Sequence, residues 1–278
     1  MNFGIILTSG DPRTAARLAA LAESAGWDGV FTWDGISIGE TETFDPWVTM
    51  AAMAMTTSRV RLGAVIVPPA RRRPWKLARE AMSVDVLSNG RLILPVGLGA
   101  IDDRAWGHVG EPTAARTRAE KLDETLAILD GLWSGEPFAF HGTHYAFEPM
   151  TFLPRPVQRP RIPIWPVGVW PVARSMRRTL RWDGVVVQMR GDEAGPSSVT
   201  PEAVREIAAY AASERPEALR GHPWDIVVDG ITGPGDAAAV DRVRQLAAAG
   251  ATWYLEANWM ETDPAVLQAR VIAGPPAI

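Results

Sequence analysis

The chain has 278 residues, no cysteine and a net charge of −4, and 47% of its residues are apolar. This composition is typical of a globular protein with a large core, and it excludes disulfides, iron–sulfur clusters, zinc–thiolate sites and a cysteine nucleophile. The acidic balance argues against a nucleic-acid partner, because the one basic run, Arg71-Arg72-Arg73, is short. No apolar run approaches the roughly 20 residues of a membrane span, and the first residues lack a basic signal-peptide region. We therefore expect a cytoplasmic protein that binds neither membranes nor nucleic acids.

Short apolar runs alternate with amphipathic stretches along the whole chain. The apolar runs predict eight strands, over 2–8, 28–32, 62–67, 91–96, 162–167, 184–188, 225–228 and 252–256. The stretches that follow them predict eight helices, over 12–25, 46–57, 75–87, 118–133, 171–180, 201–212, 237–249 and 264–273. Several helices have a polar N-cap, as at Asp11, Asp45, Thr200, Asp236 and Asp263.

Strands that alternate with helices form a parallel sheet, and eight such units in this length fit a (β/α)8 TIM barrel of the α/β class. We expect residues 1–278 to form a single barrel domain. The rival is an open doubly wound sheet, which usually has a G-x-G-x-x-G turn after its first strand, whereas this chain has Ser9-Gly10-Asp11 there. The second strand begins with Trp27-Asp28-Gly29-Val30 and the sixth with Trp182-Asp183-Gly184-Val185, which indicates either two related half-barrels or a coincidence.

Residues 134–161 interrupt the alternation between the fourth helix and the fifth strand. Alternating residues over 138–147, around Gly142, predict a small hairpin, and the proline-rich stretch that follows predicts an extended connection. We expect this insertion on the rim of the barrel, where a long loop is often functional.

The predicted helix 46–57 is apolar on every side. A barrel covers one face of an outer helix, so the other face predicts a homodimer interface. The alternative is that the insertion or the next helix covers that face.

Ligands of TIM barrels bind at the C-terminal ends of the strands. Two acids stand there, Asp34 after the second strand and Glu256 at the end of the eighth, and they are either a carboxylate pair or ordinary cap and loop residues. All four histidines lie in loops or in the insertion, and no metal-ligand pattern stands at a strand end, so we predict no metal. A serine nucleophile would need a G-x-S-x-G turn, which this sequence lacks.

Glycine-rich turns after three strands favour a phosphorylated ligand. Gly97 and Gly99 follow the fourth strand, Gly168 precedes the fifth helix with Arg174 one turn in, and residues 230–235 follow the seventh strand. The mouth is otherwise apolar and aromatic, with Trp33, Val65, Ile66, Pro68, Trp170 and Trp259. This slot suits a flavin-like ring better than a sugar phosphate, unless the tryptophans pack in the outer layer of the barrel.

Four ordered segments resemble the luciferase-like family of flavin and deazaflavin oxidoreductases. They carry LAESAGWDGVF at 21–31, TSRVRLG at 57–63, LSNGR at 87–91 followed by VGLG at 96–99, and LPRPVQ at 153–158. The resemblance implies a monooxygenase or other oxidoreductase that uses reduced FMN or coenzyme F420 on a small, largely apolar substrate. It also implies a separate flavin reductase as a partner.

The resemblance places the ring of the cofactor against the third strand, with Trp33 nearby and a non-proline cis peptide, by position at Val65–Ile66. It places the phosphate near the turns at Gly97, Gly99, Gly168 and Val169. The candidate cations for this phosphate are Arg116, Arg118 and Arg174.

The chain departs from the family at one position. Many members have a histidine after the acid that ends the second strand, and here the pair is Asp34-Gly35. Asp34, Glu256 and His108 are the candidates for the acid–base role. Two other functions stay open, which are a sugar-phosphate lyase or isomerase and a binding protein that has lost catalysis.

Overall fold

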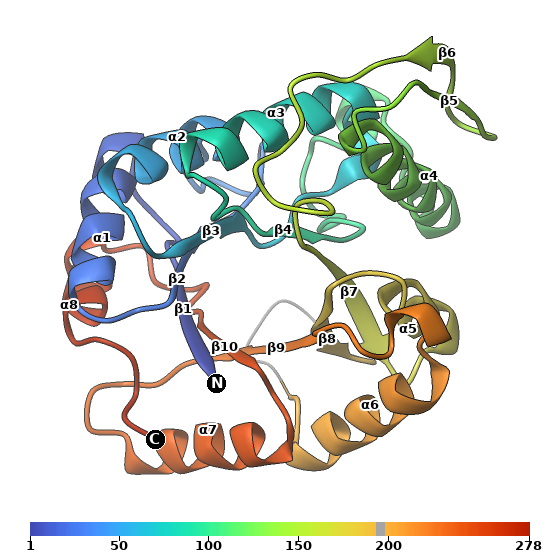
Figure 1. Ribbon diagram of the computed structural model, residues 1–278. Coiled ribbons are helices and arrows are strands. Elements are labelled where there is room, and N and C mark those ends of the chain that lie inside the picture. Colours follow the sequence, from blue (N-terminus) through green and yellow to red (C-terminus); the bar gives the residue numbers. More distant parts are fainter. Residues whose placement is uncertain (193–197) are drawn as a thin grey trace.

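The computed structural model describes residues 1–192 and 198–278. Within these ranges eight parallel strands form one sheet, in the order β3-β2-β1-β10-β9-β8-β7-β4. Their bounds are β1 Asn2–Ile6, β2 Gly29–Thr32, β3 Arg61–Ala64, β4 Leu94–Val96, β7 Ile164–Trp170, β8 Gly184–Met189, β9 Asp225–Gly230 and β10 Trp253–Glu256. Bridges from Leu62 to Leu92 and from Val67 to Val96 join the two edges, so the sheet closes. The predicted (β/α)8 barrel is confirmed, with its helices outside the strands (Figure 1).

Five of the eight α-helices in the described residues begin where a capping side chain satisfies one of their first N–H groups. Their bounds are α1 Pro12–Ser24, α2 Pro46–Thr56, α3 Pro74–Leu87, α4 Ala115–Trp133, α5 Ala173–Thr179, α6 Pro201–Glu214, α7 Ala237–Ala249 and α8 Pro264–Ile272. Five predicted N-caps accept hydrogen bonds from the first turn of α1, α2, α6, α7 and α8, and they are Asp11, Asp45, Thr200, Asp236 and Asp263. The fifth helix starts two residues later than predicted, because the N–H of Val172 first closes a turn onto the carbonyl of Val169.

Aromatic side chains fill the interior of the barrel. The rings of Trp165 and Trp253 lie 5.4 Å apart, and each lies 6.1 Å from the ring of Phe31. A Cβ at Gly4 or at Gly29 would come within 2.7 Å of the Phe31 ring, so these glycines leave the space that the ring occupies. The packed interior closes the barrel below the mouth, so a ligand that enters the barrel at the mouth is confined to the strand ends above that packing.

The insertion forms the predicted hairpin, with β5 Phe138–His141 antiparallel to β6 Ala146–Met150. Figure 1 shows it beside α4. The carboxylate of Glu124 on α4 accepts hydrogen bonds from the N–H groups of Thr143, His144 and Tyr145, which hold the turn of the hairpin. The proline-rich stretch that follows is bound to α3, because Asp85 accepts hydrogen bonds from the backbone of Val157. The hairpin therefore packs at the α3–α4 side of the barrel.

The repeated Trp-Asp-Gly-Val motif has the same structural role in both halves. The carboxylate of Asp28 accepts the N–H of Phe3 at 2.8 Å, and that of Asp183 accepts the N–H of Ile164 at 2.9 Å. Each aspartate therefore ties the start of its strand to the start of the preceding strand. This equivalence favours two related half-barrels over a coincidence.

Candidate active site

A pocket of about 430 Å³ opens at the C-terminal ends of the strands, and we call it the mouth pocket. Most of its wall is apolar, from residues at the ends of β7, β8, β9 and β10 and in the turns after β3 and β4, which include Val65, Ile66, Leu98, Val167, Val169, Val186, Val187, Val227, Val228 and Leu255. Polar groups stand at one side, where Ser175, Arg178, Gln188, Asp192 and Asp229 contribute to the lining. An apolar wall with a few polar groups is typical of a small-molecule site.

The predicted ring-contact residues Val65 and Ile66 both line the mouth pocket, and the peptide bond between them is cis as expected. A Cβ at Gly97 would lie 2.2 Å from Cδ1 of Ile66, so a side chain at this position would displace Ile66. Gly99 adopts a φ of +81°, which favours glycine, and its backbone also lines the pocket. At these two glycines the turn after β4 therefore presents backbone to a ligand.

The fifth helix contributes polar groups that the sequence did not single out. Arg178 and Ser175 line the mouth pocket, and Arg178 donates from Nη2 to Asp123 on α4 at 3.0 Å. The Ser175 hydroxyl accepts the N–H of Val169 at 3.0 Å, so this backbone donor already has a partner. Arg174, the candidate from the sequence, is exposed and outside the lining of the pocket.

Gly168 faces away from the mouth pocket. A Cβ on this residue would meet Cγ2 of Val185 at 2.6 Å and the sulfur of Met176 at 2.8 Å, so its backbone packs against α5. The predicted phosphate cradle at this turn is therefore reduced to its neighbour Val169, which does line the pocket.

Asp34 lies in a buried network of ion pairs. Its carboxylate accepts hydrogen bonds from Arg71 and Arg72, each at 2.9 Å, and the side chain is 1% exposed. Arg71 also pairs with Asp103 at 2.5 Å, and Asp103 accepts the N–H groups of Ile36 and Ser37. The network ties together the loops that follow β2, β3 and β4.

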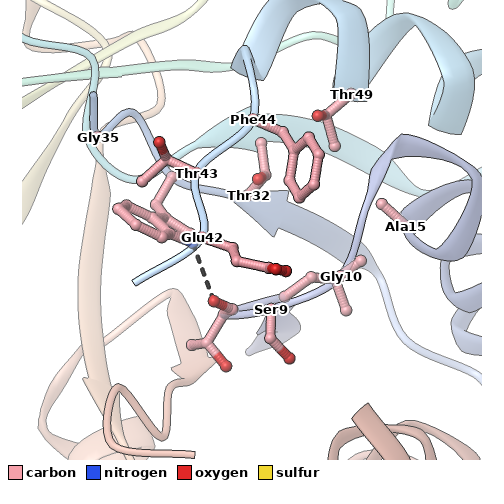
Figure 2. A pocket seen from close by; sticks show the side chains of 12 residues that line it. Ser9, Gly10, Ala15, Thr32, Gly35, Glu42, Thr43, Phe44 and Thr49 are labelled. Carbon is pink, nitrogen blue, oxygen red and sulfur yellow. Dashed lines mark hydrogen bonds between the residues drawn. The ribbon is translucent and has the colours of Figure 1, made fainter. Parts of the chain in front are cut away.

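Trp33 lies beside a second, small pocket between the ends of β1 and β2 (Figure 2). Figure 2 shows Ser9, Gly10, Glu42, Thr43 and Phe44 around this space. The indole Nε1 of Trp33 donates a hydrogen bond to the carbonyl of Thr8 at 3.1 Å.

The Trp33 ring fills the space into which a side chain at position 35 would point. A Cβ at Gly35 would lie 2.2 Å from Cζ3 of that ring. The glycine in place of the family's usual histidine is therefore coupled to the position of Trp33.

Glu256 faces away from the mouth pocket, because neighbouring residues on a strand point to opposite faces and Leu255 points inward. The carboxylate of Glu256 accepts hydrogen bonds from the backbone N–H and the hydroxyl of Thr232, and from Arg270 at 3.0 Å. It lines a separate, mostly apolar cavity of about 260 Å³ beside α8. Asp34 and Glu256 thus belong to two different clusters and form no carboxylate pair.

Arg118 and His108 have different surroundings. The buried Arg118 donates to the carbonyls of Leu98 at 2.8 Å and Gly99 at 2.9 Å, so it supports the glycine turn of the mouth pocket from behind. His108 lies exposed in the short 3-10 helix Gly107–Val109.

Among residues 1–192 and 198–278, no three potential ligand side chains gather as a metal site would require. No helix in this described part has the length and apolar character needed to cross a membrane.

The chain matches the family model described as luciferase-like monooxygenase over residues 1–271, and it belongs to that family. Among solved structures, a monooxygenase, RslO1, from Streptomyces bottropensis is 27% identical in sequence and superposes with a TM-score of 0.70, over 90% of this chain and 79% of that one.

Three curated relatives match in part. An uncharacterized protein from Mycobacterium tuberculosis is 32% identical, over 59% of this chain and 64% of the relative. The oxygenase component of a flavin-dependent trigonelline monooxygenase from Acinetobacter baylyi is 30% identical, over 53% of this chain and 41% of the relative. An F420-dependent glucose-6-phosphate dehydrogenase from Microbacterium testaceum is 31% identical, over 59% of this chain and 49% of the relative. The matches thus span less than two thirds of each relative.

Proposed function

We propose that the protein is an oxidoreductase that binds reduced FMN or coenzyme F420 in the mouth pocket and acts on a small, largely apolar substrate. The observation that carries the proposal is the mouth pocket itself, whose lining includes the apolar Val65 and Ile66, the glycines Gly97 and Gly99, and the cation Arg178. The printed names of the relatives support this choice, since one is flavin-dependent and another F420-dependent.

The residues of the mouth pocket fit such a cofactor. A flat ring needs apolar walls and room for its edges, which the valines of β7–β9 and the side-chain-free turn at Gly97 supply. Arg178 is the cation within reach of an anionic tail, and Ser175 is the hydroxyl beside it. When bound, a reduced flavin or deazaflavin supplies the electrons, and the protein orients substrate and cofactor and keeps water out.

The proposal assigns little proton transfer to Asp34 and Glu256. Each carboxylate is buried and held by at least one arginine, and proton uptake would break the ion pair with that arginine. A sugar-phosphate lyase or isomerase would need acid–base groups around its substrate. The apolar wall of the mouth pocket and the family membership favour the oxidoreductase.

Cofactor binding tests this proposal directly. The protein is titrated with FMN and with F420, and binding is followed by quenching of cofactor or tryptophan fluorescence. We expect micromolar or tighter binding of one of them, and a loss of affinity in Gly97→Val, whose side chain would collide with Ile66. Gly221→Val is the matched control, because a Cβ at Gly221 meets no atom within 4 Å. Binding of neither cofactor would contradict the proposal, and binding without turnover would leave a binding protein.

We also propose that α2 forms a homodimer interface. Val48 and Met55 lie seven residues apart on this helix, two turns along one face, and they are 59% and 70% exposed. Exposed apolar side chains on one helix face favour burial against a second copy. Analytical ultracentrifugation should show a dimer that Met55→Asp converts to monomer, while Met260→Asp, at a methionine that is 85% exposed in the loop before α8, leaves the dimer intact. A monomeric unmodified protein would contradict this.

A separate reductase follows if FMN is the cofactor. The name of the Acinetobacter baylyi relative, an oxygenase component, supports a two-protein system for the flavin case. We propose that such a partner supplies reduced FMN to this chain. Oxygen consumption with FMN and NADH should then require an added flavin reductase. Turnover of NADH by the purified chain alone would contradict that proposal.

A further inference from the structure

Another cavity lies at the end of the barrel opposite the mouth pocket. It has a volume of about 380 Å³ and is lined by α6, by the loop before β9 and by the end of α7, with the residues Ala208, Ala211, Ala212, Arg215, Arg220, Trp224, Ile226 and Gly250. Ile226 is the second residue of β9, whose other end contributes Asp229 to the mouth pocket. Figure 1 shows α6 and α7 next to each other on this side. We call this cavity the arginine pocket.

Arg215 brings a buried charge to the arginine pocket without a carboxylate in contact. The residue is 6% exposed, and its guanidinium donates from Nη1 to the carbonyl of His222 at 2.9 Å. Its Nε is buried and has no hydrogen-bond partner among the described residues. A buried guanidinium that lacks an anion carries a large desolvation cost, and burial lowers the pKa of Arg215 accordingly.

Arg220 adds a second positive charge to the same wall. It donates from Nε to the carbonyl of Arg215 and from Nη2 to that of Ser213, each at 3.0 Å, which closes the loop after α6. Neither Arg215 nor Arg220 forms an ion pair with any residue in the described ranges, 1–192 and 198–278. All other lining residues are apolar or aromatic, so the wall of the arginine pocket has two cations and no acid.

The nearest acid that acts on Arg215 is Asp183, and it is already engaged. Its charge raises the pKa of Arg215 against the effect of burial. The carboxylate of Asp183, however, pairs with Arg161 at 3.1 Å and accepts the N–H of Ile164 at 2.9 Å. It therefore offsets only part of the positive charge of the pocket.

The apolar part of the arginine pocket is formed by the flat ring of Trp224 and by the short side chains of three alanines. The indole Nε1 of Trp224 donates to the carbonyl of Thr179 at 3.2 Å, which fixes the ring. The Arg215 guanidinium lies 5.9 Å from the centre of that ring. Ala208, Ala211 and Ala212 present methyl groups, and this leaves a volume that larger side chains would fill.

We propose that the arginine pocket binds a small organic anion, whose carboxylate or phosphate accepts hydrogen bonds from Arg215 and Arg220 and whose flat apolar body lies on Trp224 and the alanines of α6. Arginine suits such a ligand because its planar group binds carboxylate and phosphate oxygens with paired hydrogen bonds. The site is independent of the cofactor proposal, because none of its lining residues belongs to the mouth pocket.

The test needs a readout at Trp224, because the chain has 12 tryptophans. The full chain is labelled with 5-fluorotryptophan, and the ¹⁹F resonance of Trp224 is identified as the one that Trp224→Phe removes. Benzoate is the probe, benzamide is its neutral counterpart of the same shape, and inorganic phosphate is an anion without an apolar body. We expect a saturable shift of the Trp224 resonance with benzoate, a weaker one with phosphate, and about tenfold weaker binding of benzamide.

Three variants decide whether the shift reports this pocket. Arg220→Gln should weaken benzoate about tenfold, and Ala212→Leu should weaken it by filling the cavity from an exposed position without a change in charge. Arg205→Gln removes an exposed arginine from the same helix outside the pocket and should leave the affinity unchanged. The proposal is overturned if the Trp224 resonance does not move, if benzamide binds as well as benzoate, or if Arg220→Gln and Arg205→Gln behave alike.

Discussion

The two sides of the barrel mouth are built from different interactions. On the side of β2, β3 and β4, buried arginines and aspartates neutralise one another, as in the pairs of Arg71 with Asp34 and Asp103. On the side of β7, β8 and β9, valines point into the mouth pocket, and the pair of Arg178 with Asp123 leaves the Asp123 side chain 49% exposed. The first side therefore fixes the loops, and the second side places one arginine, Arg178, whose side chain is 9% exposed, in the lining of the mouth pocket.

The largest effect on stability is expected from a substitution that breaks the buried ion pairs on the side of β2, β3 and β4. Asp34→Asn keeps the shape of the side chain and removes the charge that holds Arg71 and Arg72, so we expect a loss of about 3 kcal/mol in the free energy of unfolding. Urea denaturation measures it. Asp102→Asn is the control, because Asp102 is exposed, and it should change stability by less than about 0.5 kcal/mol. A stable Asp34→Asn protein that has lost turnover would instead make Asp34 a catalytic acid.

Glu256 lies on the strand between the two sides and should behave like Asp34. Glu256→Gln weakens the hydrogen bonds to Thr232 and Arg270, with an expected cost of about 2 kcal/mol. Cofactor affinity should stay the same, because the side chain faces the cavity beside α8 and not the mouth pocket. Parallel urea and cofactor titrations separate the two effects, and a selective loss of cofactor affinity would contradict the structural role.

Low pH should destabilise the protein through protonation of Asp103, with a smaller effect than the two substitutions above. Burial raises the pKa of this carboxyl, but the N–H of Ala105, the Arg71 guanidinium and the N–H groups of Ile36 and Ser37 outweigh it, so the pKa lies below the ordinary 3.8. As the pH falls, Asp103 therefore takes up its proton in the unfolded chain before it does so in the folded protein. Its contribution to the free energy of unfolding is complete above the ordinary pKa, and it is lost as the pH falls through the pKa of the folded state.

Asp103→Asn tests this pH dependence. The variant should be less stable near neutral pH and should lose less stability than the unmodified protein when the pH is lowered below about 4. Urea midpoints measured from pH 6 to about pH 3 compare the two proteins. Parallel curves for the two proteins would show that Asp103 does not contribute to the acid sensitivity.

The barrel could be predicted because its signals are local. Caps such as Asp11 and Asp45 lie within three residues of the N–H groups that they bind, and the strands are continuous apolar runs. The state of Asp34 could not be predicted in this way, because its partners Arg71 and Arg72 are 37 and 38 residues away along the chain. The sequence showed those arginines only as a short basic run.

The direction in which the Glu256 side chain points could be predicted from the sequence. Side chains alternate along a strand, and the apolar Leu255 suits the barrel interior, so Glu256 should point outward. The presence of Arg178 in the pocket could not be predicted. Arg178 donates to Asp123, which lies 55 residues earlier in the chain, and no local sequence signal predicts that contact.

Two arginines on α5 have different surroundings, since Arg178 lines the mouth pocket and Arg174, the candidate from the sequence, is exposed outside it. Arg178→Gln removes the cation that lines the mouth pocket, so the cofactor should bind about tenfold more weakly, with little change in stability because Asp123 is half exposed. Arg174→Gln removes an exposed arginine one turn earlier and should have the smaller effect. Fluorescence titration with FMN and F420 at two salt concentrations measures both variants, since binding through a charge weakens with salt. A larger loss of cofactor affinity in Arg174→Gln than in Arg178→Gln would show that the cofactor contacts the face of α5 that carries Arg174. The cofactor would then bind beside Arg174 and not beside Arg178.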